Sequence, residues 1–249
     1  MAKGKSQTEQ RMTLFLIAIN VIVFLLVFSA PEQVREGTFE RYSLSQATAF
    51  QLWRWVTSMF LHASASHLFF NMLGLYFFGR IVEGETNAQW FLSIYFVGGF
   101  LGSLSFLLTS PSPVVGASAG IFSLMGTAML LKPLEKVSFY VFPLPLGIVA
   151  LMFTVAESLV AYYQPGFGNI AHVAHIGGLI TGSVFAFAKN PKKAGKGFLL
   201  LVVMGAVLLI ISPFIAVVTG AGEFILWILE GITGFFLYGL AWLLSFLWM

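Results

Sequence analysis

Long intervals without charge constrain this chain more than any other feature of its sequence. Residues 86–131 contain no charged side chain, and another charge-free interval lies between Arg11 and Glu32. A helix needs about 20 mainly apolar residues to cross a bilayer. Only 9% of the residues are charged, whereas soluble domains carry about a quarter. We therefore exclude a water-soluble enzyme and a disordered chain, and we expect an integral membrane protein.

The apolar intervals predict an all-α, polytopic helical bundle. The candidate spans cover about residues 12–29, 65–82, the two halves of 86–131 on either side of the turn at 109–113, 138–161, 169–188, 197–219 and 223–248. Between them we expect a cytoplasmic N-terminal segment at 1–11, an external first loop at about 30–64 and a cytoplasmic basic linker at 189–196.

The positions of Lys and Arg predict the orientation of these spans. With the N-terminus in the cytoplasm, only Arg35, Arg41 and Arg54 of the 13 basic residues fall on the outer side. This asymmetry is the one that the positive-inside rule describes. The net charge of +3 therefore reflects topology, and we expect membrane lipid but no nucleic acid as a partner.

Polar side chains gather at one depth in three of the spans. His67 and Asn71 lie one turn apart on the second span, Ser118 lies on the fourth and His175 on the sixth. All three spans begin at the external side. Ser118 and His175, about four and six residues into their spans, lie at depths of about 6 and 9 Å. Polar groups inside a membrane are costly and mark functional sites, so we expect a site just below the external face.

These residue types suit nucleophilic catalysis. A serine hydroxyl is a weak nucleophile until a neighbouring base, usually a neutral histidine, accepts its proton. Two donors on one helix face, with a backbone N–H near the serine, suit an oxyanion hole. Gly178 and Gly182 form a small-xxx-small pattern that favours close helix approach and would bring His175 toward Ser118.

The combined motifs resemble the rhomboid intramembrane serine proteases. They are His67-x-x-x-Asn71, Gly116-x-Ser118, Ala174-His175-x-x-Gly178-x-x-x-Gly182, the first-loop pair Trp53-Arg54 and the run Gly79-Arg80-Ile81-Val82-Glu83. The resemblance covers about residues 12–188 and implies a six-helix core, leaving one or two additional hydrophobic helices in 197–249. One departure is Ala119, which stands where the family usually has glycine.

The resemblance also implies an activity and its residues. Ser118 would be the nucleophile and His175 the general base of a Ser–His dyad, while His67, Asn71 and the Ser118 amide would stabilise the oxyanion. The implied reaction is hydrolysis of a peptide bond in or next to a transmembrane segment of a membrane-protein substrate. No metal and no cofactor are implied.

Several further residues carry expectations of their own. We expect Trp53 and Arg54 to anchor and staple the first loop, and His62 to be a solvated loop residue. For His172 three roles stay open: its ring stacks on a neighbouring ring, supports the proposed site, or faces water. Glu157 snorkels to water, bonds a neighbouring helix or tunes substrate entry, and we expect Glu157→Gln to leave the dyad intact.

Four other functions fit parts of the sequence less well. Gly116-x-Ser118-x-Gly120 fits the nucleophile elbow of an α/β-hydrolase, but that fold needs soluble strands. A transporter site would lie near the bilayer centre within repeated halves, and this cluster is shallow. A metalloprotease would need a motif such as His-Glu-x-x-His, which is absent from the sequence. A catalytically inactive relative typically lacks the serine or the histidine, whereas this sequence has both.

We expect a prokaryotic plasma membrane as the location, since no organellar targeting segment is visible. The C-terminal segments are expected to be dispensable, so that truncation after about residue 196 preserves activity. The sequence does not indicate the natural substrate or the oligomeric state.

Overall fold

The computed structural model describes residues 11–139, 142–163 and 172–211, with the side chains of α8 described as far as Val155. Three of its helices are long and apolar enough to cross a membrane, namely Arg11–Ser29, Ala88–Leu107 and Pro191–Ile211. The chain is therefore a multi-pass membrane protein with a helical architecture, and this part of the sequence prediction is confirmed.

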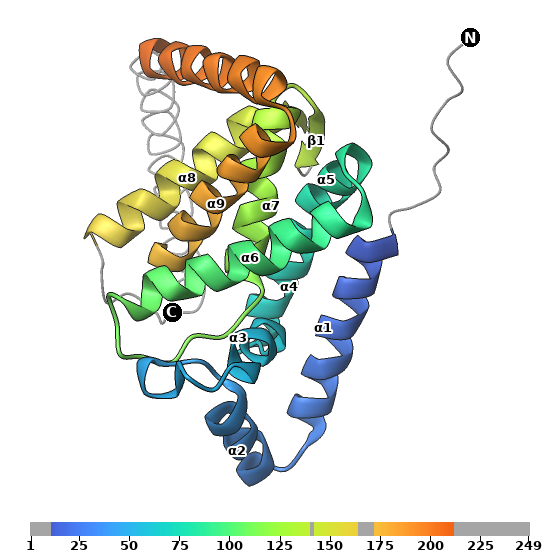
Figure 1. The fold of residues 1–249 in the computed structure, drawn as a ribbon, viewed down its shortest axis with the longest axis vertical. Helices are drawn as coiled ribbons and strands as arrows, with labels where there is room; N and C mark the ends of the chain where they lie inside the picture. The colour runs from blue at the N-terminus through green and yellow to red at the C-terminus, as the bar shows by residue number, and fades with distance from the viewer. Residues whose placement is uncertain (1–10, 140–141, 164–171, 212–249) are drawn as a thin grey trace, which may run out of the picture. The chain divides into compact units, whose positions relative to one another are not determined.

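The elements up to the turn at 109–113 are helical (Figure 1). In chain order they are α1 (Arg11–Ser29), α2 (Glu32–Tyr42), η1 (Gln46–Thr48), α3 (Trp53–Thr57), η2 (Ser58–Phe60), α4 (Ala65–Gly74), the π-helical turn η3 (Leu75–Gly79), α5 (Arg80–Glu85) and α6 (Ala88–Leu107). After the turn come α7 (Ser118–Leu131), β1 (Lys136–Phe139), β2 (Phe142–Pro145), α8 (Leu146–Tyr163), α9 (His172–Lys189) and the helix Pro191–Ile211.

Three spans differ in detail from their expected bounds. The second span is interrupted by the π-helical turn η3. The fifth begins at Leu146 rather than at about 138, because β1 and β2 pair as antiparallel strands, with Lys136 opposite Pro145. Pro143 and Pro145 lack the N–H that a helix interior needs. The expected linker 189–196 is already helical from Pro191, and the expected span 223–248 lies outside the described residues.

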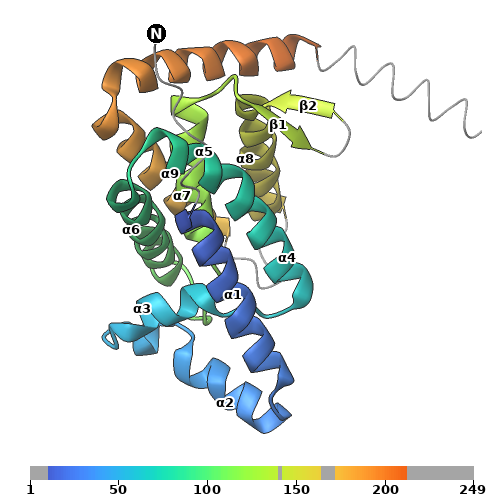
Figure 2. The same ribbon diagram turned by 90° about the vertical axis from the view of Figure 1, so that its right-hand side faces the viewer.

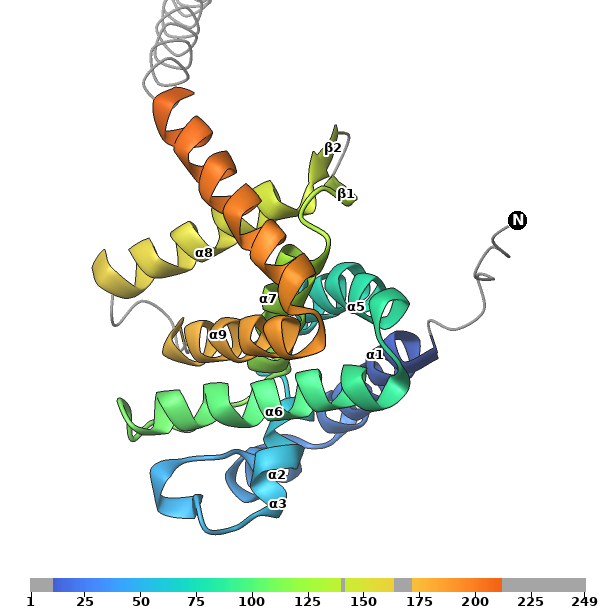
Figure 3. The same ribbon diagram turned by 45° about the horizontal axis from the view of Figure 1, so that its top comes forward.

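Helix α7 packs against both α6 and α9, and Figure 3 shows α6 and α9 lying side by side. Small residues make this packing close. An added Cβ on Gly178 would collide with the Ala119 carbonyl of α7, and one on Gly182 would collide with the Ser123 carbonyl. The backbones of α7 and α9 therefore touch, as the small-xxx-small pattern predicted.

Helix α1 runs beside α4 and packs on the second span (Figure 2). The Glu83 carboxylate on α5 accepts hydrogen bonds from the backbone N–H groups of Met12 and Thr13, at 2.8 and 3.0 Å, and from the Thr13 hydroxyl at 2.6 Å. The first N–H groups of a helix have no partner within the helix, so Glu83 caps α1 from a distant part of the sequence.

Candidate active site

Helix α4 carries His67 in its first turn and Asn71 one turn later. The Ser64 hydroxyl caps this helix by accepting a hydrogen bond from the His67 N–H at 3.1 Å. Asn71 is buried, and its Nδ2 donates to the His67 carbonyl at 2.9 Å. An amide nitrogen carries two hydrogens, so this hydrogen bond leaves Asn71 with a second donor.

The His67 ring lies against the loop that leads into α7. A Cβ built on Gly116 would be 2.8 Å from Nε2 of His67 and 3.9 Å from Nδ2 of Asn71. Gly116 has a φ of +114°, which side chains disfavour, and its N–H donates to the Ser58 carbonyl at 2.9 Å. Both donors of α4 therefore lie beside the residue two positions before Ser118.

Ser118 is the first residue of α7 and is partly exposed. The sequence placed it about four residues into its helix, which was wrong, because the positive φ of Gly116 prevents the helix from starting earlier. The first N–H groups of a helix are free donors, so the Ser118 amide is available to a ligand. Within the described residues, the Ser118 hydroxyl itself makes no hydrogen bond.

Helix α9 brings His175 to the same part of α7. His175 is 7% exposed, and its ring stacks on Phe122 with a centroid separation of 4.3 Å and an interplanar angle of 4°. Phe122 lies one turn after Ser118, and Ala119 packs against Ala174, the neighbour of His175. Residues from α4, α7 and α9 thus converge around the start of α7.

The first-loop pair divides into an exposed and a buried residue. Trp53 is 55% exposed, whereas Arg54 is 9% exposed. Nη1 of Arg54 donates to the carbonyls of Glu40 and Ser43, at 2.6 and 2.9 Å, and its Nε donates to Gln51 at 2.6 Å. Arg54 therefore ties the end of α2 to α3.

Two candidates remain, His172 and Glu157. His172 lies near the cluster, whereas the side chain of Glu157 is outside the described part of the structure. His172 is buried in the first turn of α9, with its ring 6.2 Å from that of His175. The backbone of Glu157 belongs to α8, but its side chain lies outside the described residues. The expectations for Glu157 therefore stay predictions.

His62 contradicts its expected role as a solvated loop residue. It is 1% exposed, and its ring meets the His67 ring edge to face at a centroid distance of 5.1 Å. The prediction was wrong because this stretch of the first loop is buried, as Met59 and Leu61 also are. The sequence has four histidines, but their number and spacing do not show which of their rings are buried.

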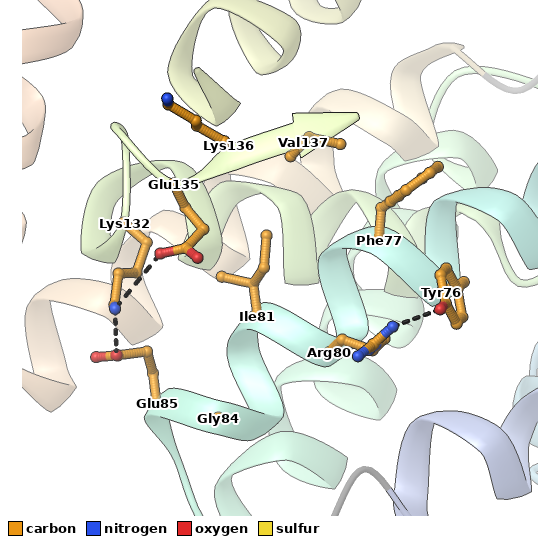
Figure 4. A pocket seen from close by; sticks show the side chains of 10 residues that line it. All are labelled: Tyr76, Phe77, Arg80, Ile81, Gly84, Glu85, Lys132, Glu135, Lys136 and Val137. Atoms are coloured by element: carbon orange, nitrogen blue, oxygen red, sulfur yellow. Dashed lines mark hydrogen bonds and ion pairs between the residues drawn. The ribbon is translucent and has the colours of Figure 1, made fainter. Parts of the chain in front are cut away.

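A cavity of about 500 Å³ lies elsewhere, between the second span and the segment after α7 (Figure 4). At its rim, Lys132 forms ion pairs with Glu85 at 3.2 Å and with Glu135 at 3.5 Å. Burial raises the pKa of Glu85, but hydrogen bonds from Lys193 and Lys132 outweigh burial and leave its pKa below the ordinary 4.5. The lining contains no histidine, serine or threonine, so this cavity holds neither member of a serine–histidine pair.

The cluster at the start of α7 can support proton transfer and oxyanion binding. It offers one hydroxyl, one buried imidazole on a neighbouring helix, and donors from His67, Asn71 and the Ser118 amide. Among the described residues, no group of three or more His, Cys, Asp or Glu side chains could hold a metal ion.

Comparison with known proteins gives a consistent set of relatives. A family model described as a rhomboid domain matches residues 49–192. Rhomboid protease GluP of Bacillus subtilis (strain 168) is 32% identical over 193 residues, which cover 74% of this chain and 36% of that protein.

Two further relatives cover different shares of their own lengths. RHOMBOID-like protein 6, mitochondrial, of Arabidopsis thaliana is 38% identical over 136 residues, covering 54% of this chain and 43% of that protein. Putative rhomboid protease YdcA of Bacillus subtilis (strain 168) is 28% identical over 184 residues, covering 72% of this chain and 88% of that protein. The chain thus spans less than half of the first two relatives and most of the third.

Proposed function

Because this chain belongs to the rhomboid family, we propose that it is an intramembrane serine endopeptidase in which Ser118 is the nucleophile and His175 the general base. Its substrates are membrane proteins, which it cleaves in or next to their transmembrane segments. Of the relatives described above, GluP is named a rhomboid protease and YdcA a putative rhomboid protease.

One observation supports this proposal: the rings of His67 and His175 lie against residues on either side of Ser118 in the chain. The His67 ring lies beside Gly116, two residues before Ser118, and the His175 ring stacks on Phe122, four residues after it. A nucleophile needs a base on one side and oxyanion donors on the other.

The proposed reaction proceeds through an acyl-enzyme. His175 accepts the Ser118 proton while Oγ attacks the substrate carbonyl carbon. The carbonyl oxygen becomes an oxyanion that accepts hydrogen bonds from His67, from the second Nδ2 hydrogen of Asn71 and from the Ser118 N–H. The tetrahedral intermediate then expels the amine, which takes the proton from His175. Water, activated by His175, attacks the ester and releases Ser118.

Charge placement supports the proposed topology, with a cytoplasmic N-terminus and the site just below the external membrane face. Three basic residues in the first loop, against ten on the other side, favour this orientation. We propose the plasma membrane as the location. One relative is named mitochondrial, so fractionation of the source cells tests this part.

The activity is tested with the full chain reconstituted into liposomes together with a single-pass membrane protein. We expect cleavage by the wild type, and none by Ser118→Ala or His175→Ala. Ser123→Ala is the matched control, because it removes a different hydroxyl from α7, one that is buried, and should cleave normally. EDTA should have no effect. Equal cleavage by Ser118→Ala, or loss of cleavage in EDTA, would overturn the proposal.

A further inference from the structure

His62 is a buried polar ring without a hydrogen bond. Neither Nδ1 nor Nε2 has a hydrogen-bond partner, although the Phe60 carbonyl interacts with the ring. Burial, with a contribution from His67, lowers the pKa of His62 to about 4. At neutral pH the ring is therefore uncharged and carries one N–H donor and one bare nitrogen.

Leaving these groups unpaired is costly. A buried donor or acceptor without a partner destabilises a protein by about 1–3 kcal/mol. An apolar ring such as phenylalanine would fill the same space without that cost. A role in packing alone therefore does not account for an imidazole at this position, and the unpaired nitrogens call for another explanation.

The surroundings of His62 point to His67. The two rings meet edge to face, with centroids 5.1 Å apart and an interplanar angle of 63°. Two imidazoles joined by an N–H···N hydrogen bond have centroids about 5 Å apart, given a donor–acceptor distance of about 3 Å. The observed separation of the rings therefore matches the separation that this hydrogen bond requires.

The segment that carries His62 also holds the loop before Ser118. The Ser58 carbonyl, at the start of η2, accepts the hydrogen bond from the Gly116 N–H at 2.9 Å. Ser58, Met59 and Leu61 are all buried. The same short stretch of chain therefore supports both Gly116 and the His67 ring that lies against it.

We propose that His62 is a positioning residue for His67: with substrate bound, the His62 N–H donates to one ring nitrogen of His67 and so keeps the His67 N–H directed at the oxyanion. The hydrogen bond made by one ring nitrogen decides which nitrogen of a neutral imidazole carries the proton. Hydrogen bonds of this kind are often loose in the free enzyme and tighten in the complex. This inference rests on the proposed function.

The test compares His62→Phe with His62→Gln in the full chain, using the liposome assay to measure kcat and KM. Phenylalanine keeps a ring and removes both nitrogens, so we expect kcat to fall about 10- to 100-fold, as for loss of a group that orients a site residue. KM should stay unchanged and the thermal midpoint should not fall. Glutamine restores an N–H donor, so its kcat should lie between those of the wild type and His62→Phe.

A double-mutant cycle shows whether His62 acts through His67. On a His67→Ala background, His62→Phe should cause no further loss of kcat. Wild-type kcat in His62→Phe, losses that multiply in the double variant, or a kcat loss that follows a falling thermal midpoint would each overturn the inference. If the wild type is active, these outcomes overturn only the role of His62, and the proposed protease function is unaffected. If neither the wild type nor Ser118→Ala cleaves substrate, both proposals fail.

Discussion

Gly116 is the residue on which the geometry of the candidate site depends most directly. Its φ of +114° starts α7 at Ser118, and its missing side chain leaves room for the His67 ring. The sequence located the cluster through residue types with known chemistry. It could not place His62, because a histidine in a loop carries no pattern that distinguishes a buried from a solvated ring.

Replacing Gly116 with alanine should impair catalysis more than stability. The added Cβ would lie 2.8 Å from the His67 ring and would strain a backbone with positive φ. Misplacing a site group by about 1 Å can cost about 100-fold in rate, so we expect a kcat loss of that order in the liposome assay. Gly37→Ala, where a Cβ meets nothing within 4 Å, is the control. Normal kcat in Gly116→Ala would contradict the proposed placement of His67.

Among the elements, α7 and α9 carry the proposed nucleophile and base, and these two helices are in close contact. Its sequence signal was specific, since Gly178 and Gly182 are spaced one turn apart on α9, and these glycines do meet α7 backbone. Other features of the elements had no comparable signal. The π-helical turn η3 and most of the paired strands β1 and β2 lie in apolar sequence that hydropathy alone assigns to regular spans.

Substitution of Gly178 by alanine should destabilise the bundle. The new Cβ would collide with the Ala119 carbonyl, and a backbone atom cannot rotate away. Overpacking of this kind costs about 1–3 kcal/mol, so the thermal midpoint in detergent should fall. Gly195→Ala serves as the control because no atom lies within 4 Å of its built Cβ. Equal midpoints for both variants would show that α7 and α9 are not in backbone contact.

On the scale of the whole molecule, hydropathy and charge predicted the succession of spans because both act over 20 residues at a time. Contacts between distant segments were not predictable in this way. An ion-pair network joins Glu85 at the end of α5 to Lys132 after α7 and to Lys193 in the helix Pro191–Ile211. Gly197 of that helix also packs on the Leu130 carbonyl. Truncation after residue 196 would remove this second contact, which the sequence did not reveal.

The Glu85 network should make stability depend on acid pH. The folded pKa of Glu85 lies below its ordinary 4.5, so the network contributes fully above about pH 4.5 and is lost as the pH falls through the lower folded value. In Glu85→Gln we expect a loss of about 1 kcal/mol at pH 7, because the partners are partly exposed. The difference from the wild type should vanish in strong acid. A difference in stability between Glu85→Gln and the wild type that persists in strong acid would mean that Glu85 does not act through its charge.

A chain that ends after residue 211 should keep its activity. It retains the Lys193 ion pair and the Gly197 contact with Leu130, whereas a chain ending at residue 196 loses the second. We expect cleavage by the longer chain at the wild-type rate and a lower thermal midpoint for the shorter one. An inactive but folded 1–211 chain would assign a function to the last segment.

The most direct test of the central claim is whether Ser118 is an activated nucleophile, and it requires no knowledge of the substrate. Detergent-purified wild type, Ser118→Ala and His175→Ala would be treated with a fluorophosphonate probe, and the labelled peptide identified by mass spectrometry. We predict labelling of the wild type alone, with the adduct on Ser118. Folded wild type without label, or label on another residue, would contradict the proposed dyad.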